Sequence, residues 1–233
     1  MRRTLLPLLL LCSLLSAQEE KPFVRSKIMV QYGVSLVDPR QINDRIAMTN
    51  QVLGSNAKTI KNLPELSATV VFRPQNDFKI VLVRAGYATV ERLFDVSLPW
   101  TDAAGGVLGS IDGTITETYT VYPFSLGVGM MSDDGASQFQ LELCYALAEI
   151  GEEGSYRTDR SMSYSHTLTS ETYSIRVAGS VAVPVTPWLG VTVELGYRYL
   201  LFDEFEDEKG ASAPWVEMPL HGVSGSIGLS LML

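Results

Sequence analysis

Apolar and non-apolar residues alternate with a period of two along much of this chain, and this alternation restricts the fold more than any other feature. Successive side chains of a β-strand point to opposite faces, so the pattern gives each strand one apolar face. In residues 139–147 and 189–201 every odd position is a large apolar residue, and residues 173–185 and 223–233 follow the same rule except at Gly179 and Gly225. Each run is about as long as a tilted strand that crosses a bilayer, roughly 9 to 11 residues.

Four earlier segments, at residues 28–36, 66–72, 78–87 and 114–131, bring the expected number of strands to eight. Both faces of 78–87 carry apolar residues, and we expect Val81 and Val83 on the outer face and Arg84 on the inner one. In 114–131 the apolar parity changes near Tyr122–Pro123. A β-bulge at this position would explain the change, because one extra residue reverses the facing of all residues beyond it.

The connections between these segments alternate in length. Polar turns lie at 74–77, 132–135 and 186–188, and long links lie at 38–64, 95–113, 151–168 and 203–219. Such alternation is typical of an up-and-down transmembrane barrel with three short turns on one side of the membrane and four longer loops on the other. We expect one all-β domain at residues 18–233, an eight-stranded antiparallel barrel.

The composition of the two faces indicates which one points outward. The non-apolar face consists mostly of Gly, Ser, Ala and Thr, which suits a narrow lumen better than a water-exposed surface. A secreted lipocalin-like barrel, which also has eight alternating strands, is the alternative. Aromatic residues at the ends of the apolar face favour two membrane interfaces. These are Tyr173, Tyr197 and Tyr199 on the loop side and Trp188 on the turn side.

The first 17 residues have the features of a secretory signal peptide. Arg2 and Arg3 precede an apolar run at residues 5–15, and Ser16–Ala17 offers a small-residue cleavage site. Cys12 lies in this segment, so Cys144 is the one thiol left in residues 18–233, and we expect it to be buried rather than to form a disulfide or a metal site. The 26 acidic and 18 basic residues argue against a nucleic-acid partner.

As an architecture, residues 26–233 resemble the small eight-stranded outer-membrane proteins of the OmpA, OmpX and OmpW kind. The resemblance rests on the four long loops over three short turns and on no sequence motif. It implies insertion into the outer membrane of a diderm bacterium by the barrel-assembly machinery, after Sec-dependent export through the periplasm. It further implies contact with outer-membrane lipid and lipopolysaccharide, and we expect a monomer.

Five charged residues fall on the expected lumen face, six to ten residues from the nearest short turn. An unpaired charge in such a confined place costs several kcal/mol, so these residues should form a salt-bridge cluster. The cluster would fill and lock the barrel, or it would act as a gate for solute; the narrow lumen favours the first role. The residues are Arg84, Glu142, Arg176, Glu194 and Arg198.

The first long loop contains a helix signal at residues 39–53. Asp38 is a candidate N-cap, Pro39 suits the first turn and Gly54 can end the helix. Ile42, Ile46 and Leu53 lie near one face. The helix would cover the barrel mouth, present a platform for a partner, or enter the lumen as a plug.

The fourth loop carries an acidic run around Phe205. Acidic runs are usually solvated, and the spacing of a calcium-binding loop is absent, so we expect no metal or cofactor site. Weak contact with divalent cations that bridge lipopolysaccharide phosphates is the alternative. The run comprises Asp203, Glu204, Glu206, Asp207 and Glu208.

Candidate catalytic residues are few. The two histidines, His166 and His221, lie near loops with Ser165, Ser170 and Ser224 close in sequence, but no spacing matches a known Ser-His-acid arrangement. The sequence therefore predicts a non-enzymatic barrel with an envelope-structural or surface-interaction role. A narrow channel for small or apolar solutes and a lipid A-modifying enzyme are the alternatives.

Overall fold

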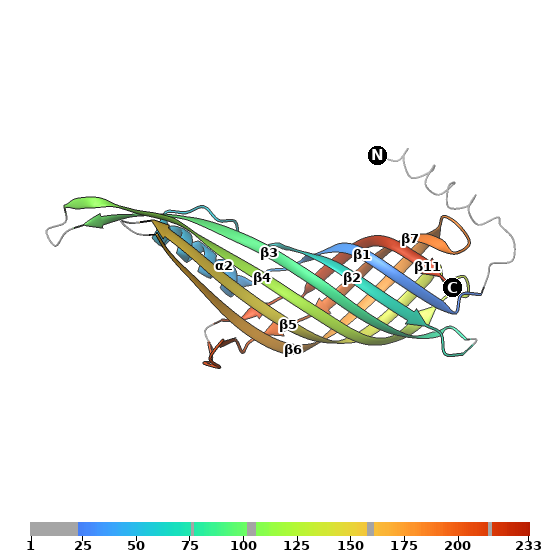
Figure 1. The fold of residues 1–233 in the computed structure, drawn as a ribbon. Helices are drawn as coiled ribbons and strands as arrows, with labels where there is room; N and C mark the ends of the chain where they lie inside the picture. Colours follow the sequence, from blue (N-terminus) through green and yellow to red (C-terminus); the bar gives the residue numbers. More distant parts are fainter. Residues whose placement is uncertain (1–22, 76, 102–105, 158–160, 214–215) are drawn as a thin grey trace.

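A closed ring of eight long antiparallel strands forms the body of the molecule in the residues that the structure describes (Figure 1). The computed structural model describes residues 23–75, 77–101, 106–157, 161–213 and 216–233, so the predicted signal peptide lies outside them. Each strand pairs with its neighbour in sequence, and β1 and β11 pair to close the ring. The strands are β1 (Ser26–Leu36), β2 (Asn62–Phe72), β3 (Lys79–Thr101), β4 (Val107–Met131), β5 (Ser137–Arg157), β6 (Ser161–Pro184), β7 (Leu189–Tyr199) and β11 (Gly222–Met232).

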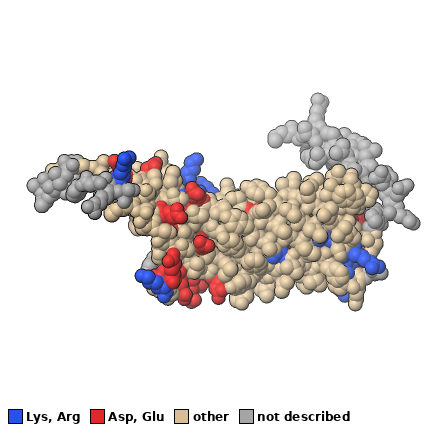
Figure 2. Space-filling model, viewed as in Figure 1, with Lys and Arg blue, Asp and Glu red and all other residues tan. Residues whose placement is uncertain are grey.

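The apolar faces point outward, as predicted. Leu126 and Leu195 expose 66% and 65% of their surface, whereas Arg84 and Glu194 on the opposite faces are buried. Figure 2 shows that most of the visible surface between the two ends of the barrel carries no charge, and that Asp and Glu gather at one end. A water-soluble barrel would have the reverse arrangement, with its apolar side chains enclosed.

The predicted bulge near Tyr122–Pro123 is wrong. The pairing of β4 with β3 keeps one register across this point, from Val121 opposite Ala88 to Phe124 opposite Ala85. The odd-numbered residues of β4 point inward on both sides of Tyr122. What changes is their chemistry, because on the loop side of Tyr122 apolar residues such as Val121 are buried in the lumen. The outward residues there become polar because the strand has left the hydrocarbon and enters water.

The second and third long links are mostly strand rather than loop. β3 and β4 stay paired up to Thr101 and Val107, and β5 and β6 up to Arg157 and Ser161. Most residues on the outer faces of these segments are polar, so the apolar alternation that marks a strand within the membrane is lost. The result is a four-stranded sheet that extends beyond the barrel ring (Figure 1).

The first link holds the helix α2 (Arg40–Leu53), as predicted, but Asp38 is not its cap. Pro39 is at the N-cap position, no side chain caps the helix, and the Asp38 carboxylate instead pairs with Arg40 Nε at 3.2 Å. Gly54 ends the helix in the left-handed region at φ 67°, and its N–H donates to the Asn50 carbonyl. None of the helices in the described part of the chain is long and apolar enough to cross a membrane.

The fourth link folds back onto the barrel through three short strands. β8 (Leu201–Phe202) pairs with β10 (Met218–Pro219), and β9 (Glu206–Asp207) pairs with Leu168 and Thr169 of β6. Phe202 and Phe205 are fully buried, with ring centroids 6.3 Å apart. These two buried rings therefore hold the acidic run at the barrel mouth.

Candidate functional site

The predicted charged residues lie on four strands of the barrel. Each occupies a position whose side chain points into the lumen. Arg84 comes from β3, Glu142 from β5, Arg176 from β6, and Glu194 and Arg198 from β7. Glu142 lies directly opposite Arg176 across the β5–β6 pair. All five side chains are at least nine-tenths buried.

Four of these residues form one ion-pair cluster, which we call the charged layer. Both terminal nitrogens of Arg84 donate to the two carboxylate oxygens of Glu194, at 3.0 and 2.7 Å. Arg176 donates to Glu194 Oε1 at 2.6 Å and to Glu142. Arg84 Nε also lies 3.5 Å from Glu142 Oε2. Each carboxylate thus faces both guanidinium groups.

Arg198 lies outside this cluster and has its own partner. Its Nη1 is 3.0 Å from Glu65 Oε2 on β2. Glu65 was missing from the sequence prediction, which began the second strand at Leu66, yet it shares the inward parity of Ser67 and Thr69. That parity is the signal that would have identified it. The three arginines and three glutamates together balance in charge.

Two glutamines extend the charged layer toward the turn side. Gln140 Nε2 donates to Glu142 Oε1 at 2.8 Å and to Glu194 Oε2 at 3.1 Å, and Gln138 donates to Gln140. Further down, the fully buried Lys27 donates to the carbonyl of Gly135 in the β4–β5 turn. Polar contacts therefore run along the lumen wall from the middle of the barrel to the turns.

An apolar cluster lies below the charged layer, at the turn end of the lumen. Its members are buried and come from β1, β2, β3, β4, β11 and the segment before β1. Arg73 closes the same end, because it donates to the carbonyls of Met131 and Ser132 and to Asp133, while Phe23 lies over its guanidinium. The cluster consists of Val24, Met29, Val71, Ile80, Leu82, Met131 and Met232.

A second apolar cluster fills the lumen above the charged layer. Inward residues of the long strands, such as Phe94 and Val121, pack there with Ile42 and Ile46 of α2 and with Phe205 of the fourth link. Through Ile42 and Ile46, α2 packs against the inward residues of the strands at the barrel mouth. Apolar clusters thus lie in the lumen both above and below the charged layer, and buried polar side chains share the turn-side level.

One arginine fastens α2 to the barrel wall. Arg45 Nη2 donates to Glu117 of β4 at 2.6 Å and to Glu152 of β5 at 3.0 Å. These two glutamates lie directly opposite each other, where like charges repel. Tyr119 donates to Glu117, and Tyr164 donates to Glu152 at 2.6 Å. Nothing local in the sequence indicates this clamp, because it joins segments that lie 72 and 107 residues apart.

Replacing Arg45 with Ala should loosen α2 without opening the ring of strands. The change removes the cation between Glu117 and Glu152, and because Arg45 is partly exposed we expect a loss of about 1–2 kcal/mol. Limited proteolysis of the refolded protein should cut within residues 40–61 faster than in the wild type. Arg40→Ala, which removes an exposed ion pair on the same helix, is the control. Equal cleavage rates in the two variants would exclude the clamp.

The predicted interface aromatics lie at the two ends of the apolar band. Tyr173 packs on Tyr145 with ring centroids 5.5 Å apart, and Tyr199 stacks on His221 at the same distance. With Tyr87, Tyr122 and the exposed Tyr197, these tyrosines form what we call the tyrosine girdle. Trp188 is exposed in the turn between β6 and β7, at the opposite end.

The remaining candidates lie apart from the charged layer. His166 lies opposite Glu152 in the projecting part of the β5–β6 pair with Ser165 beside it, whereas Ser170 is buried further down β6 and Ser224 is on β11. Cys144 is buried, with its sulfur 2.7 Å from Ser125 Oγ.

In the acidic run, Asp207 accepts the N–H groups of Ala211 and Lys209, and these hydrogen bonds lower the pKa of its carboxyl group. Asp203, Glu204, Glu206 and Glu208 lie around it in the fourth link. Within the described ranges, no group of three His, Cys, Asp or Glu side chains is arranged to hold a metal ion. The hydrogen bonds of Asp207 thus order the turn itself.

The sequence matches no family model and no curated protein. Among solved structures, Ail of Yersinia pestis is similar at 12% identity and a TM-score of 0.44, over 90% of this chain and 99% of that one. A major outer membrane protein from Thermus thermophilus is similar at 12% identity and a TM-score of 0.45, over 89% and 99%. The outer membrane protease OmpT from Escherichia coli aligns over 94% and 100%, at 11% identity and a TM-score of 0.38.

The geometry of the barrel is that of a membrane-spanning protein. Eight antiparallel strands close into a ring, the ring is apolar outside between two aromatic levels, and its polar and charged side chains pair inside. A closed β-barrel with an apolar outer band is one of the two structures that can span a bilayer, and short turns on one side with long extensions on the other are typical of the bacterial outer membrane. The protein is therefore an integral outer-membrane β-barrel protein.

Proposed function

We propose that the protein is a closed, non-enzymatic barrel that holds an acid-rich β-sheet outside the outer membrane for contact with a cationic partner. The observation that carries this proposal is the filled lumen beneath a sheet formed by β3, β4, β5 and β6, which continues beyond the tyrosine girdle (Figure 1). The four strands extend beyond the barrel, and the barrel itself encloses side chains rather than an open pore.

The filled lumen argues against the channel alternative. A solute would have to pass the turn-side apolar cluster, separate the paired side chains of the charged layer and displace α2 together with Phe205. Separating buried ion pairs costs several kcal/mol, because each buried charge would lose its partner. Eight-stranded barrels of this width are generally filled by their own side chains.

The two free edges of the projecting sheet differ. Above Ala88, β3 has no strand partner on the β2 side among the described residues. The backbone N–H of Asp95 on this edge donates to Ser55 Oγ, and Pro99 has no backbone N–H to donate. Such features prevent pairing with another strand. Residues 161–167 of β6 also lack a strand partner on the side of β7 in the described part of the chain, and they contain no proline and no Lys, Arg, Asp or Glu.

β9 already pairs with β6 just below this edge, at Leu168 and Thr169. An extended segment of a partner can continue that pairing by adding a strand. The surroundings are acidic, because Glu152 faces His166 across the hairpin and β9 itself belongs to the acidic run. Figure 2 shows Asp and Glu gathered at one end of the molecule. Charge complementarity therefore favours a basic segment and disfavours an anionic one.

Refolded protein in planar bilayers should give no conductance steps above the background of the bilayer. The closed lumen is the reason, and the same preparation must show heat-modifiable gel migration, which demonstrates that the barrel is folded. Regular conductance steps from folded wild-type protein would favour the channel and contradict the proposal.

The surface role is tested by peptide binding to the protein in nanodiscs. An extended peptide that alternates Lys and Thr should bind, an otherwise identical Glu–Thr peptide should not, and added salt should weaken binding. Replacing residues 155–163 with an Asn-Gly turn removes the outer part of the β6 edge, residues 161–163, and should lower the affinity about tenfold. Replacing residues 99–110 in the same way shortens the β3–β4 hairpin and should leave it unchanged. Equal effects of the two deletions would refute recognition at β6.

The non-enzymatic part of the proposal is tested separately. Wild-type protein and a His166→Ala variant should leave lipid A equally intact when the lipids are analysed by mass spectrometry. If the wild type released fatty acid from lipid A and the His166→Ala variant did not, the protein would instead be an enzyme.

A further inference from the structure

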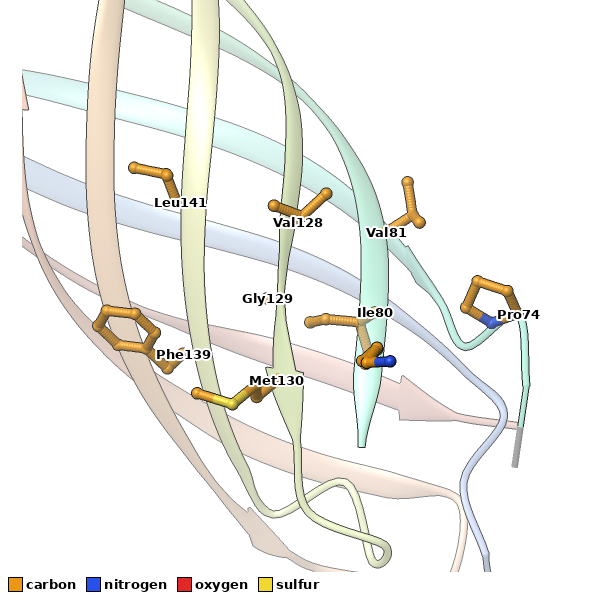
Figure 3. Close-up of a pocket in the computed structure, with 9 residues that line it drawn as sticks. Pro74, Ile80, Val81, Val128, Gly129, Met130, Phe139 and Leu141 are labelled. Carbon is orange, nitrogen blue, oxygen red and sulfur yellow. The ribbon is translucent and has the colours of Figure 1, made fainter. Parts of the chain in front are cut away.

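A groove crosses the outer surface of β3, β4 and β5 near the turn end of the barrel (Figure 3). Its volume is about 530 Å³, within the range of roughly 300–1,000 Å³ that small-molecule sites occupy. Val81, Val128 and Leu141 form one side of it, and Lys79, Met130 and Phe139 form the other. The groove lies within the apolar band, so lipid rather than water meets it.

The strand register explains why the groove exists. Val81 pairs with Val128 and Val128 with Leu141, while Lys79 pairs with Met130 and Met130 with Phe139. These two rows are separated by the pair Ile80–Gly129, and Ile80 turns its side chain into the lumen, where it is buried. The floor is therefore bare backbone, and apart from Lys79 both walls are apolar, which suits a hydrocarbon chain.

A second hollow of about 350 Å³ lies on the other side of the Met130–Phe139 row. Phe78, Ser132 and Ser137 line it, and the last two belong to the region of the β4–β5 turn. The two hollows share Met130 and Phe139, so the apolar trough continues toward the level where lipid head groups meet the turns. A ligand with an apolar tail and a polar head therefore fits better than a purely apolar one.

Two opposite charges lie at this polar end. Lys79 Nζ is 3.6 Å from Asp77 Oδ2, and the backbone N–H of Lys79 donates to Asp77 Oδ1 at 2.9 Å, which holds the carboxylate beside the groove. The side chain of Lys79 is 72% exposed and that of Asp77 30%, so both remain accessible. A head group that carries a phosphate and a primary ammonium group offers the complementary pair.

We propose that this groove binds a glycerophospholipid with an ethanolamine-type head group. One acyl chain lies between the two rows over Ile80 and Gly129. The phosphate contacts the ammonium group of Lys79, and the ammonium group of the lipid donates to Asp77. Both contacts are charge-assisted hydrogen bonds, which are stronger than neutral ones.

Native mass spectrometry of the refolded full chain tests the proposal. The protein is offered equal amounts of phosphatidylethanolamine and phosphatidylglycerol of the same chain length, and retained lipid is counted after detergent release. Wild type should retain one phosphatidylethanolamine several-fold more often than phosphatidylglycerol. Lys79→Gln should lower retention of both lipids about tenfold, the effect of losing one hydrogen bond to a charged group. Asp77→Asn should remove the preference between them.

Filling the groove should expel the acyl chain. Val128→Trp places a large side chain in the trough and should abolish retention, whereas Val193→Trp, on the lipid-facing side of β7 and similarly exposed, should not. Heat-modifiable migration shows that both variants fold. Equal retention in the two tryptophan variants, or equal retention of the two lipids by the wild type, would mean that the groove holds ordinary surrounding lipid and would overturn the proposal.

Discussion

Glu194→Ala should lower the free energy of unfolding by about 3–5 kcal/mol, the range found when one member of a buried ion pair is removed. Glu194 accepts hydrogen bonds from Arg84, Arg176 and Gln140, and all four side chains are buried. Its removal leaves Glu142 to neutralise two guanidinium groups. Urea unfolding in lipid vesicles, followed by tryptophan fluorescence and gel migration, measures the change.

Glu217→Ala is the matched control for this experiment. Glu217 accepts a hydrogen bond from Gln41 at 2.8 Å, but this contact is exposed to solvent at the barrel mouth. We expect a change within about 0.5 kcal/mol, as for most surface substitutions. Glu142→Ala should be destabilising too, because it also removes a carboxylate from the charged layer. An unchanged unfolding midpoint for Glu194→Ala would mean that the charged layer does not lock the barrel.

Gly228→Ala should impair closure of the ring. A β-carbon on Gly228 would point into the seam between β1 and β11 and collide with the Val30 carbonyl oxygen and the Gln31 backbone. Backbone atoms cannot move aside as a flexible side chain can, and overpacking of this kind costs about 1–3 kcal/mol or more. The folded fraction after refolding into vesicles, measured by heat-modifiable migration, should fall.

Gly225 on the same strand gives the comparison. A β-carbon there would meet Leu195 Cδ2 at 3.5 Å, which is ordinary van der Waals contact, so Gly225→Ala should refold like the wild type. The two variants make the same chemical change three residues apart. If both refold equally well, the close approach of β1 and β11 does not limit assembly.

The strand number, the ring and the outward face were predictable because lipid imposes one rule on every strand within the membrane. Leu141 on β5 and Val193 on β7 lie on strands that do not pair, yet each must be apolar on the same face. The inward parity of Arg84, Glu142, Arg176 and Glu194 follows from that rule. Their individual partners do not, because a period of two places a side chain on a face but leaves its height relative to another strand undetermined.

The predicted facing of side chains was wrong where the strands pass from lipid into water. Tyr119 and Val121 are apolar, and the lipid rule placed them outward, but they lie above the membrane and fill the lumen. The same change hid the strands of the projecting sheet, whose outer residues are polar. The clamp between Arg45, Glu117 and Glu152 was beyond sequence reasoning, because nothing local indicates which loop residue reaches which strand.

The change from an apolar to a polar outer face at the tyrosine girdle also fixes how deeply the barrel sits in the membrane. Glu91, Glu149 and Glu171 point outward within four residues above the girdle, while the leucines and valines below it point outward into hydrocarbon. Sinking the barrel by a few ångströms would bury carboxylates in lipid, and raising it would wet the apolar band, so both displacements are costly. The described ends of the projecting strands, at Thr101 and Val107 and at Arg157 and Ser161, are therefore held at a constant height above the membrane.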